Sequence, residues 1–181
     1  MKKILSAILT IVAIFSMNAC NNSANESSNN QNNEENKIEL TTSNYTKYID
    51  VKSSISVNDF TLKNLAGAYL INGSATLTLT VYPKQPIKCY NVQIEYTNNT
   101  PYDNMGVELI LEQTPILSVP ADGNLAEEYD INIATGDVDV LYEQIVIWRR
   151  TREQMIDSIE GPFIFYMLTD LLSVSGYIVT E

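Results

Sequence analysis

The chain has 181 residues, of which 45% are hydrophobic, and its 22 acidic and 11 basic residues give a net charge of −11. Nucleic-acid binding needs clustered lysines and arginines that displace counterions from phosphates, so this balance argues against it. The chain contains no histidine, which excludes Ser-His-Asp and Cys-His catalysis and removes the commonest metal ligand. We therefore expect no metal and no cofactor.

The first 20 residues have the layout of an export signal. Lys2 and Lys3 form a positive n-region, residues 4–15 form an apolar h-region, and the small Ala19 directly precedes Cys20. The apolar run is short of the roughly 20 residues that a membrane-spanning helix needs. We therefore predict a signal peptide over residues 1–19.

The end of this segment, Met17-Asn18-Ala19-Cys20, resembles the lipobox of bacterial lipoproteins, closely at Ala19 and Cys20 and loosely at Met17 and Asn18. The resemblance implies diacylglyceryl transfer to the Cys20 thiol, cleavage before it, and a protein anchored by lipid on the extracytoplasmic side of the cell membrane. An ordinary secretory signal cut elsewhere is the alternative. Cleavage would leave 9 basic and 22 acidic residues, a net charge of −13, so acyl chains rather than anionic head groups would hold the protein.

A polar stretch follows the cysteine. Residues 21–37 contain no aromatic residue and no aliphatic residue larger than Ala24. Such a segment cannot bury enough apolar surface to offset the entropy of ordering its backbone, so we predict a disordered tether over residues 20–37. Flexible chain of this length spans on the order of 20–25 Å, enough to lift a domain clear of the head groups. Residues 38–181 suit one folded domain.

Alternation with a period of two dominates the predicted domain. A short helix is predicted over residues 44–49, behind N-cap candidates at 41–43. The clearest strand is 75–81, where apolar residues alternate with three threonines. Other strand-like runs, separated by turn residues, are 54–57, 87–96, 107–111, 116–119, 128–133 and 175–179. In the run 87–96 we assign to the buried face Tyr90, Val92, Ile94 and Tyr96.

Three segments near the C-terminus have less regular patterns. Residues 145–148, Ile-Val-Ile-Trp, form the most apolar run, which predicts a central strand buried on both faces. Residues 153–159 predict one or two helical turns with Met155, Ile156 and Ile159 inward, ended by Gly161-Pro162. Residues 163–168 are continuously apolar, and periodicity leaves strand and buried helix open.

Seven or eight short strands with frequent turns predict an all-β domain, an antiparallel sandwich of two sheets around one core. Behind a lipobox and a polar tether, this domain is similar to the immunoglobulin-like domains of many bacterial lipoproteins. The Cys…Trp…Cys hallmark of antibody domains is absent, so the likeness concerns architecture only. With Cys20 lipidated, Cys89 has no disulfide partner, and its strand-like surroundings predict a buried, inert thiol.

Candidate catalytic groups are limited to carboxylates. Asp137 and Asp139, two residues apart, would share one face of a strand, and Glu127, Glu128 and Glu143 are further candidates. The turns 122–124 and 103–104 offer oxygens to calcium, although turn chemistry explains them equally well. We interpret all these groups as solvent-facing or turn positions and predict no catalytic residue.

Candidate ligand-binding residues are two tyrosines and two arginines. Tyr82 and Tyr102 lie at turns, where an amphipathic ring can stack on a sugar or a peptide. Arg149 and Arg150 belong to the basic run of an acidic chain, which meets either an anionic ligand or, the interpretation we favour, nearby carboxylates in ion pairs.

Together, these patterns predict a non-catalytic binding module of the cell envelope with a protein, peptide or glycan partner. Loops at the ends of the sandwich are the expected site, an expectation that rests on fold analogy. The alternatives are a carboxylate-based envelope hydrolase and a structural accessory subunit of an envelope complex.

Overall fold

The computed structural model of the protein describes residues 36–181, which belong to one compact unit. The predicted signal peptide, Cys20 and the tether up to residue 35 lie outside the described residues. Lys37, predicted as the last tether residue, instead begins the first strand, β1 (Lys37–Glu39).

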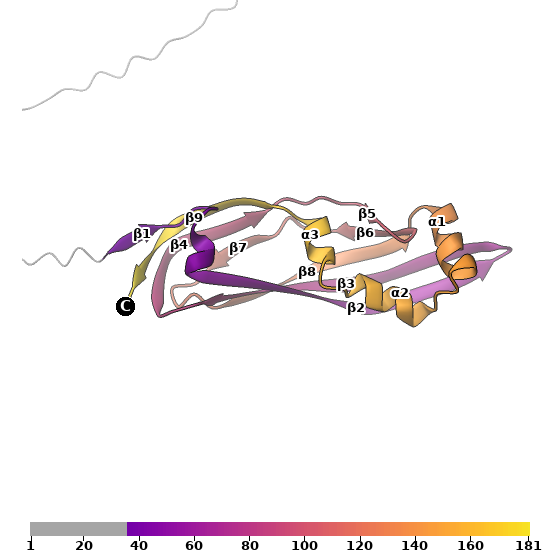
Figure 1. The fold of residues 1–181 in the computed structure, drawn as a ribbon, viewed down its shortest axis with the longest axis horizontal. Helices are drawn as coiled ribbons and strands as arrows, with labels where there is room; N and C mark the ends of the chain where they lie inside the picture. The colour runs from indigo at the N-terminus through magenta and orange to yellow at the C-terminus, as the bar shows by residue number, and fades with distance from the viewer. Residues whose placement is uncertain (1–35) are drawn as a thin grey trace, which may run out of the picture. The chain divides into compact units, whose positions relative to one another are not determined.

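Two antiparallel sheets form a sandwich-like arrangement, as predicted, with nine strands within residues 36–181 (Figure 1). One sheet has the strand order β1-β9-β4-β7, and the other has the order β2-β3-β8-β6-β5. After β1 the strands are β2 (Ile49–Leu65), β3 (Ala68–Pro83), β4 (Ile87–Tyr96), β5 (Tyr102–Asp103), β6 (Val107–Leu111), β7 (Ile116–Val119), β8 (Leu125–Thr135) and β9 (Leu171–Thr180).

The strand order follows that of an immunoglobulin-like sandwich. When β2, β3, β4, β6, β8 and β9 are taken as strands A to F, the order A-B-E-D falls on one sheet and F-C on the other. The short β1 lies beside F, where such a domain places its last strand, and β7 extends the sheet beyond C. The first strand thereby pairs with the last, with Lys37 opposite Val179.

Side chains of both sheets build one hydrophobic core. The predicted inward residues of β3 are each at most 1% exposed: Ala75, Leu77, Leu79 and Val81. Full burial of a leucine side chain contributes about 1.5–3 kcal/mol, so this core holds the fold. Cys89 is buried and free, as predicted, and burial raises the pKa of its thiol.

The predicted phase of β4 is wrong over its first half. Cys89 faces the core, whereas Tyr90 is half-buried and stacks on Tyr177 with ring centroids 5.1 Å apart. The phase changes at Asn91, whose φ is +50°, because β4 bulges there opposite Gly176. A Cβ on Gly176 would overlap the Asn91 carbonyl oxygen, so the bulge requires glycine.

The predicted helix at the start of the domain is a single 3-10 turn, η1 (Tyr45–Lys47). The Asn44 side chain fixes this turn, because its Oδ1 accepts from the Thr41 N–H at 2.8 Å and its Nδ2 donates to the Glu39 carbonyl at 2.9 Å. Ile49 then enters the core as the first, fully buried residue of β2.

The chain between β8 and β9 is helical, and we call residues 137–168 the helical segment. It contains α1 (Val138–Tyr142), the π-helix η2 (Glu143–Ile147), α2 (Arg152–Ile159) and α3 (Ile164–Leu168). Helix α2 confirms the turns predicted over 153–159, and the undecided run 163–168 is helical. In Figure 1, α1 and α2 lie toward the turn of the β2–β3 hairpin, and β1 and the C-terminus lie at the opposite end.

The central strand predicted over residues 145–148 is therefore wrong. Ile147 belongs to η2 and is 62% exposed, and Trp148 directly after it is 67% exposed. A four-residue apolar run has no periodicity that separates strand from helix, and its β-branched residues misled the assignment. The local signals around the run, described below, start helices on both sides of it.

Helix α2 covers the outer edge of the long strand β2, whose other edge pairs with β3. The Val57 N–H donates to Glu160 Oε1 at 2.9 Å, and Arg152 Nε donates to the Phe60 carbonyl oxygen at 2.9 Å. The Arg152 guanidinium also lies 5.7 Å from the centre of the Phe60 ring. These side chains satisfy edge groups that would otherwise invite pairing with another chain.

Candidate ligand-binding cavity

The helical segment begins at a capping residue. Asp137 Oδ1 accepts hydrogen bonds from the N–H groups of Asp139 at 2.9 Å and Val140 at 3.1 Å, which makes it the N-cap of α1. Leu141 then packs, fully buried, into the core, and Gly106 (φ +71°) lies so close that a Cβ would overlap the Leu141 backbone. The predicted placement of Asp137 and Asp139 on one face of a strand is therefore wrong, because the cap starts a helix.

The end of η2 sets the positions of Trp148 and Arg150. The Trp148 N–H donates to the Glu143 carbonyl at 2.9 Å, and the Arg150 N–H donates to the Gln144 carbonyl at 3.0 Å. Between them Arg149 has a φ of +53°, a left-handed conformation that costs about 1–2 kcal/mol for a residue with a Cβ. Single π-turns and left-handed residues other than glycine concentrate at functional sites, so this geometry makes the turn a candidate site.

Helix α2 provides a second wall. Thr151 Oγ1 accepts from the Gln154 N–H at 3.3 Å and Gln154 Oε1 accepts from the Thr151 N–H at 2.9 Å, which is a complete capping box. Met155 and Ile159 are fully buried, as predicted, whereas Ile156, also predicted inward, is only partly buried. The burial of Met155 and Ile159 fixes the rotation of α2 about its own axis and turns its polar face outward.

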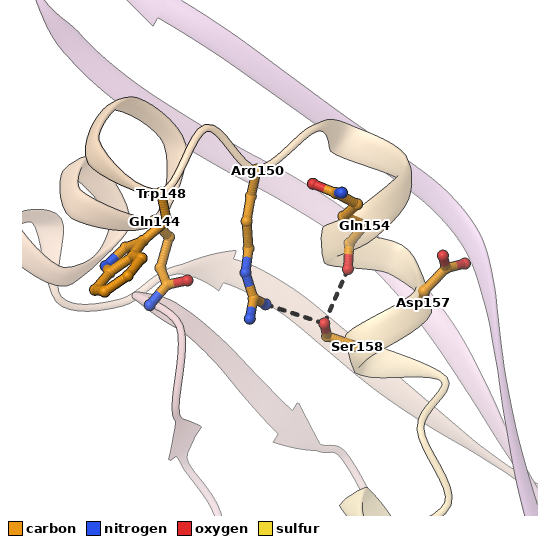
Figure 2. A pocket seen from close by; sticks show the side chains of 6 residues that line it. All are labelled: Gln144, Trp148, Arg150, Gln154, Asp157 and Ser158. Atoms are coloured by element: carbon orange, nitrogen blue, oxygen red, sulfur yellow. Dashed lines mark hydrogen bonds between the residues drawn. The ribbon is translucent and has the colours of Figure 1, made fainter.

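A cavity of about 620 Å³ lies between the end of η2 and α2, lined by Gln144, Trp148, Arg150, Gln154, Asp157 and Ser158 (Figure 2). Its volume falls within the roughly 300–1,000 Å³ of small-molecule sites. Figure 2 shows the Arg150 side chain between Gln144 and Ser158. Arg150 Nη1 donates to Ser158 Oγ at 3.1 Å and to Met105 Sδ at 3.1 Å, and Ser158 Oγ donates to the Gln154 carbonyl at 2.9 Å. These bonds hold the guanidinium in place.

Several polar groups of the lining make no hydrogen bond within residues 36–181. The bonds of Arg150 engage its Nη1 alone, so Nε and Nη2 keep three N–H donors. The Asp157 carboxylate and the Trp148 indole N–H also have no hydrogen-bond partner among these residues. The cavity therefore offers free donors, free acceptors and an exposed aromatic surface.

The ion pairs that we favoured for the basic run are absent from the described part of the chain. Within residues 36–181 the one ion pair joins Lys88 Nζ and Glu181 Oε1 at 3.9 Å. The run connects η2 to α2, so its side chains meet the edge of β2 and the face of α2 rather than a strand rich in glutamate. Arg150 thus keeps an unpaired charge beside the cavity.

Of the four predicted ligand-binding residues, Arg150 lines the cavity, and Arg149 supplies the left-handed turn beside it. The two tyrosines lie elsewhere. The Tyr82 hydroxyl donates to Asp50 Oδ2 at 2.8 Å, and Lys52 Nζ lies 4.9 Å from the centre of its ring. Tyr102 is half-buried on β5, and burial raises the pKa of its phenol. Their binding of a ligand stays a prediction.

Trp148 was missed from the sequence because the run 145–148 was assigned to the core. A usable signal was present in the Thr151-x-x-Gln154 spacing of a capping box. It predicts a helix whose N-cap, Thr151, lies three residues after Trp148, which places Trp148 just before the start of a helix. The tryptophan then falls in a connection, where functional side chains are common.

The predicted carboxylate and calcium candidates make local contacts. Three of them accept a hydrogen bond from a nearby group: Glu127 from the Tyr129 hydroxyl (2.6 Å), Asp122 from the Asn124 N–H (3.1 Å) and Asp103 from the Asp137 N–H (2.8 Å). Residues 36–181 contain no group of three Cys, Asp or Glu side chains arranged to hold a metal ion. Local contacts therefore account for Glu127, Asp122 and Asp103.

A smaller cavity of about 260 Å³ lies between η1 and α3, and its lining includes Tyr45, Tyr96 and Tyr166. Tyr96 packs edge-on against Phe165 with ring centroids 5.2 Å apart. Burial, reinforced by Tyr45, raises the pKa of Tyr96 above its ordinary value. The Tyr96 ring serves the packing of β4 against α3.

Comparisons with protein-family models, with curated proteins and with solved structures found no match for this chain. Among residues 36–181, none of the helices has the length and apolar character needed to cross a bilayer. Function is therefore inferred from the cavity between η2 and α2 and from the sequence patterns.

Proposed function

We propose that this protein is a lipid-anchored, non-catalytic binding module of the cell envelope, and that its ligand occupies the cavity between η2 and α2. One observation carries the proposal: Trp148 and Arg150 present an exposed ring and unused N–H donors to a cavity of about 620 Å³. The Trp148 ring is 67% exposed and so adds little to the packing of the fold, and the turn that presents it contains the left-handed Arg149. Local strain that packing does not require points to a binding role.

The position of the cavity supports this proposal. A tether that ends before β1 would join the folded unit at the end opposite the β2–β3 turn, toward which α1 and α2 lie (Figure 1). A flexible tether from Cys20 would then join the domain at the end far from the cavity and leave the cavity accessible. Such a placement suits a ligand that comes from outside the membrane.

The hydrolase alternative is less favoured at this cavity. Glycosidase-type chemistry needs two carboxyl groups that face each other across the substrate. Asp157 is the one carboxylate among the lining residues. The cavity therefore supports binding better than hydrolysis by paired carboxylates.

A structural accessory subunit is the second candidate, because the helical segment also exposes apolar side chains. Val138, Tyr142 and Ile147 are each about half exposed or more. This candidate predicts that the protein purifies with a partner at fixed stoichiometry and that Ile147→Asp releases the partner. The binding-module proposal predicts instead that Ile147→Asp leaves ligand binding intact.

The anchor is tested by Cys20→Ser. We expect the wild-type protein to fractionate with membranes and to carry the mass of an acylated N-terminus, and the variant to lose both properties. A variant that stays in the membrane fraction with unchanged mass would contradict the lipid anchor.

The cavity is tested by thermal unfolding of the purified full-length protein with three ligand classes: neutral oligosaccharides, anionic oligosaccharides and hexapeptides. A ligand that binds only the native state raises the Tm, by an amount that grows with its concentration. We expect at least one class to raise the Tm of the wild type and of Phe163→Ala, a control for an exposed aromatic residue outside the cavity, but not of Trp148→Ala. No shift with any class, or an equal shift in Trp148→Ala, would contradict the proposed site.

A further inference from the structure

We propose that the cavity between η2 and α2 binds a neutral carbohydrate, stacked on the Trp148 indole and hydrogen-bonded through Arg150 and Asp157. This inference rests on the proposed function and names the chemical class of its ligand.

The aromatic surface suits a sugar ring. Trp148 is 67% exposed, and its side chain lines the cavity rather than the core. A pyranose has an apolar face of C–H groups and a rim of hydroxyls, so it matches an indole that is apolar on its faces and polar at its edge. The Trp148 N–H donates to the Glu143 carbonyl at 2.9 Å, which sets the backbone position from which this exposed ring projects.

The hydrogen-bonding groups match hydroxyls. Each sugar hydroxyl both donates and accepts, so its site needs donors and acceptors side by side. Arg150 keeps three N–H donors, Asp157 offers carboxylate oxygens, and Gln144 offers both kinds of group. Gln154 contributes its amide N–H₂, since its Oε1 accepts from Thr151. An anion would use the donors alone and would meet the Asp157 carboxylate.

The charge of the site favours a neutral ligand. The lining contains one cation, Arg150, and one anion, Asp157, and the two form no ion pair within 4 Å. The whole chain carries a net charge of −11, which repels polyanions at long range. A neutral glycan meets no such repulsion and can use both donors and acceptors of the lining.

An extended peptide fits the site less well. Peptides commonly bind by adding a strand to an open sheet edge or by laying an apolar face into an apolar groove. On the edge of β2 that α2 covers, Glu160 already bonds the Val57 N–H and Arg152 bonds the Phe60 carbonyl. Five of the six lining residues are polar, which also disfavours an apolar ligand.

The chain offers a direct probe of this inference, because its single tryptophan lies in the cavity. The purified full-length protein, in a detergent without a sugar head group, is titrated with cellohexaose, maltohexaose, mannohexaose and chitohexaose. Trp148 fluorescence is the readout, and calorimetry repeats each titration. We expect a saturable fluorescence change, matched by calorimetry, with at least one of these neutral hexasaccharides.

Variants connect binding to the named side chains. Calorimetry should show an affinity at least about tenfold lower for Trp148→Ala and for Asp157→Ala. Arg150→Lys keeps the charge but loses the planar donors, and we expect a loss of about tenfold. Phe163→Ala removes an exposed aromatic ring outside the cavity and should bind like the wild type. Equal binding by Trp148→Ala and wild type would overturn the inference.

The panel separates failure of this inference from failure of the proposed function. If oligogalacturonate binds and the four neutral sugars do not, the neutral-ligand inference is overturned and the binding site stands. If only hexapeptides raise the Tm in a Trp148-dependent way, the carbohydrate class is overturned and the proposed function survives. If no class gives a Trp148-dependent shift, both are overturned.

Discussion

Strand β3 and the helical segment use apolar residues in opposite ways. In β3 the inward side chains Leu77 and Leu79 are 0% exposed, and threonines occupy the other face. In the helical segment the apolar side chains divide, with Leu141 and Met155 buried while Ile147 and its neighbours face solvent. Burial in the core explains the alternation of apolar residues in β3. In the helical segment, burial explains the apolar residues that pack on the sheets, such as Leu141 and Met155, but not the exposed apolar residues such as Ile147.

This difference separates stability from function. Two sets of residues attach the helical segment to the sheets: its buried side chains, and Arg152 with Glu160, which bond the edge of β2. The connection between η2 and α2 contains the left-handed Arg149 and the exposed Trp148. We therefore expect substitutions in β3, and at the residues that attach the helical segment to the sheets, to change the free energy of unfolding. Substitutions around Trp148 should instead change the affinity for the ligand.

The largest effect is expected in the core of β3. Leu77→Ala removes a fully buried side chain and should lower the free energy of unfolding by about 2–5 kcal/mol, because a cavity remains. Ile147→Ala removes a side chain of equal size from the exposed surface and should change it by less than about 0.5 kcal/mol. Urea unfolding followed by circular dichroism measures both. Similar losses would mean that Ile147 is packed and that the comparison fails.

Two glycines with positive φ test how closely α1 packs on the sheet. Gly67, in the β2–β3 turn, has open space around a Cβ, so Gly67→Ala should cost only the backbone strain of about 1–2 kcal/mol. Gly106→Ala adds a clash with the Leu141 backbone, and we expect a total loss of about 2–5 kcal/mol. The difference between the two unfolding free energies isolates the packing of α1. Equal losses would show that α1 does not approach Gly106 closely.

The covering of β2 is tested by Arg152→Ala. The variant loses a charged hydrogen bond to the Phe60 carbonyl and a cation–π contact, and we expect a loss of about 1–3 kcal/mol. The uncovered edge should also raise self-association in sedimentation experiments. Lys47→Ala, on the 3-10 turn, is a matched control for loss of one positive charge. If both variants stay monomeric and equally stable, Arg152 does not protect the edge.

The smallest effect is expected at the cap of α1. Asp137→Ala leaves the N–H groups of Asp139 and Val140 without their acceptor and should lower the free energy of unfolding by about 0.5–2 kcal/mol. Asp137→Asn can cap equally well and should stay close to the wild type. Chemical denaturation of the two variants is the measurement. A loss in Asp137→Asn equal to that in Asp137→Ala would mean that charge rather than capping matters.

The sequence predicts the regular strands well, because burial on one face leaves a period of two that threonine reinforces, as in 75–81. It does not predict the phase change at Asn91, because the bulge depends on Gly176 in a distant strand. It misassigns residues 145–148 because exposed apolar residues on a helix look like a buried strand. Of the candidate site, Arg150 was found from the basic run, and Trp148 was hidden by that misassignment.

The most direct test of this account is the accessibility of the Trp148 indole to acrylamide in the native protein. Because the chain has one tryptophan, its fluorescence reports this side chain alone. We predict emission typical of a solvated indole and a quenching constant close to that of the urea-unfolded chain. A blue-shifted emission with quenching several-fold weaker would place Trp148 in the core and remove the binding surface on which the proposed function depends.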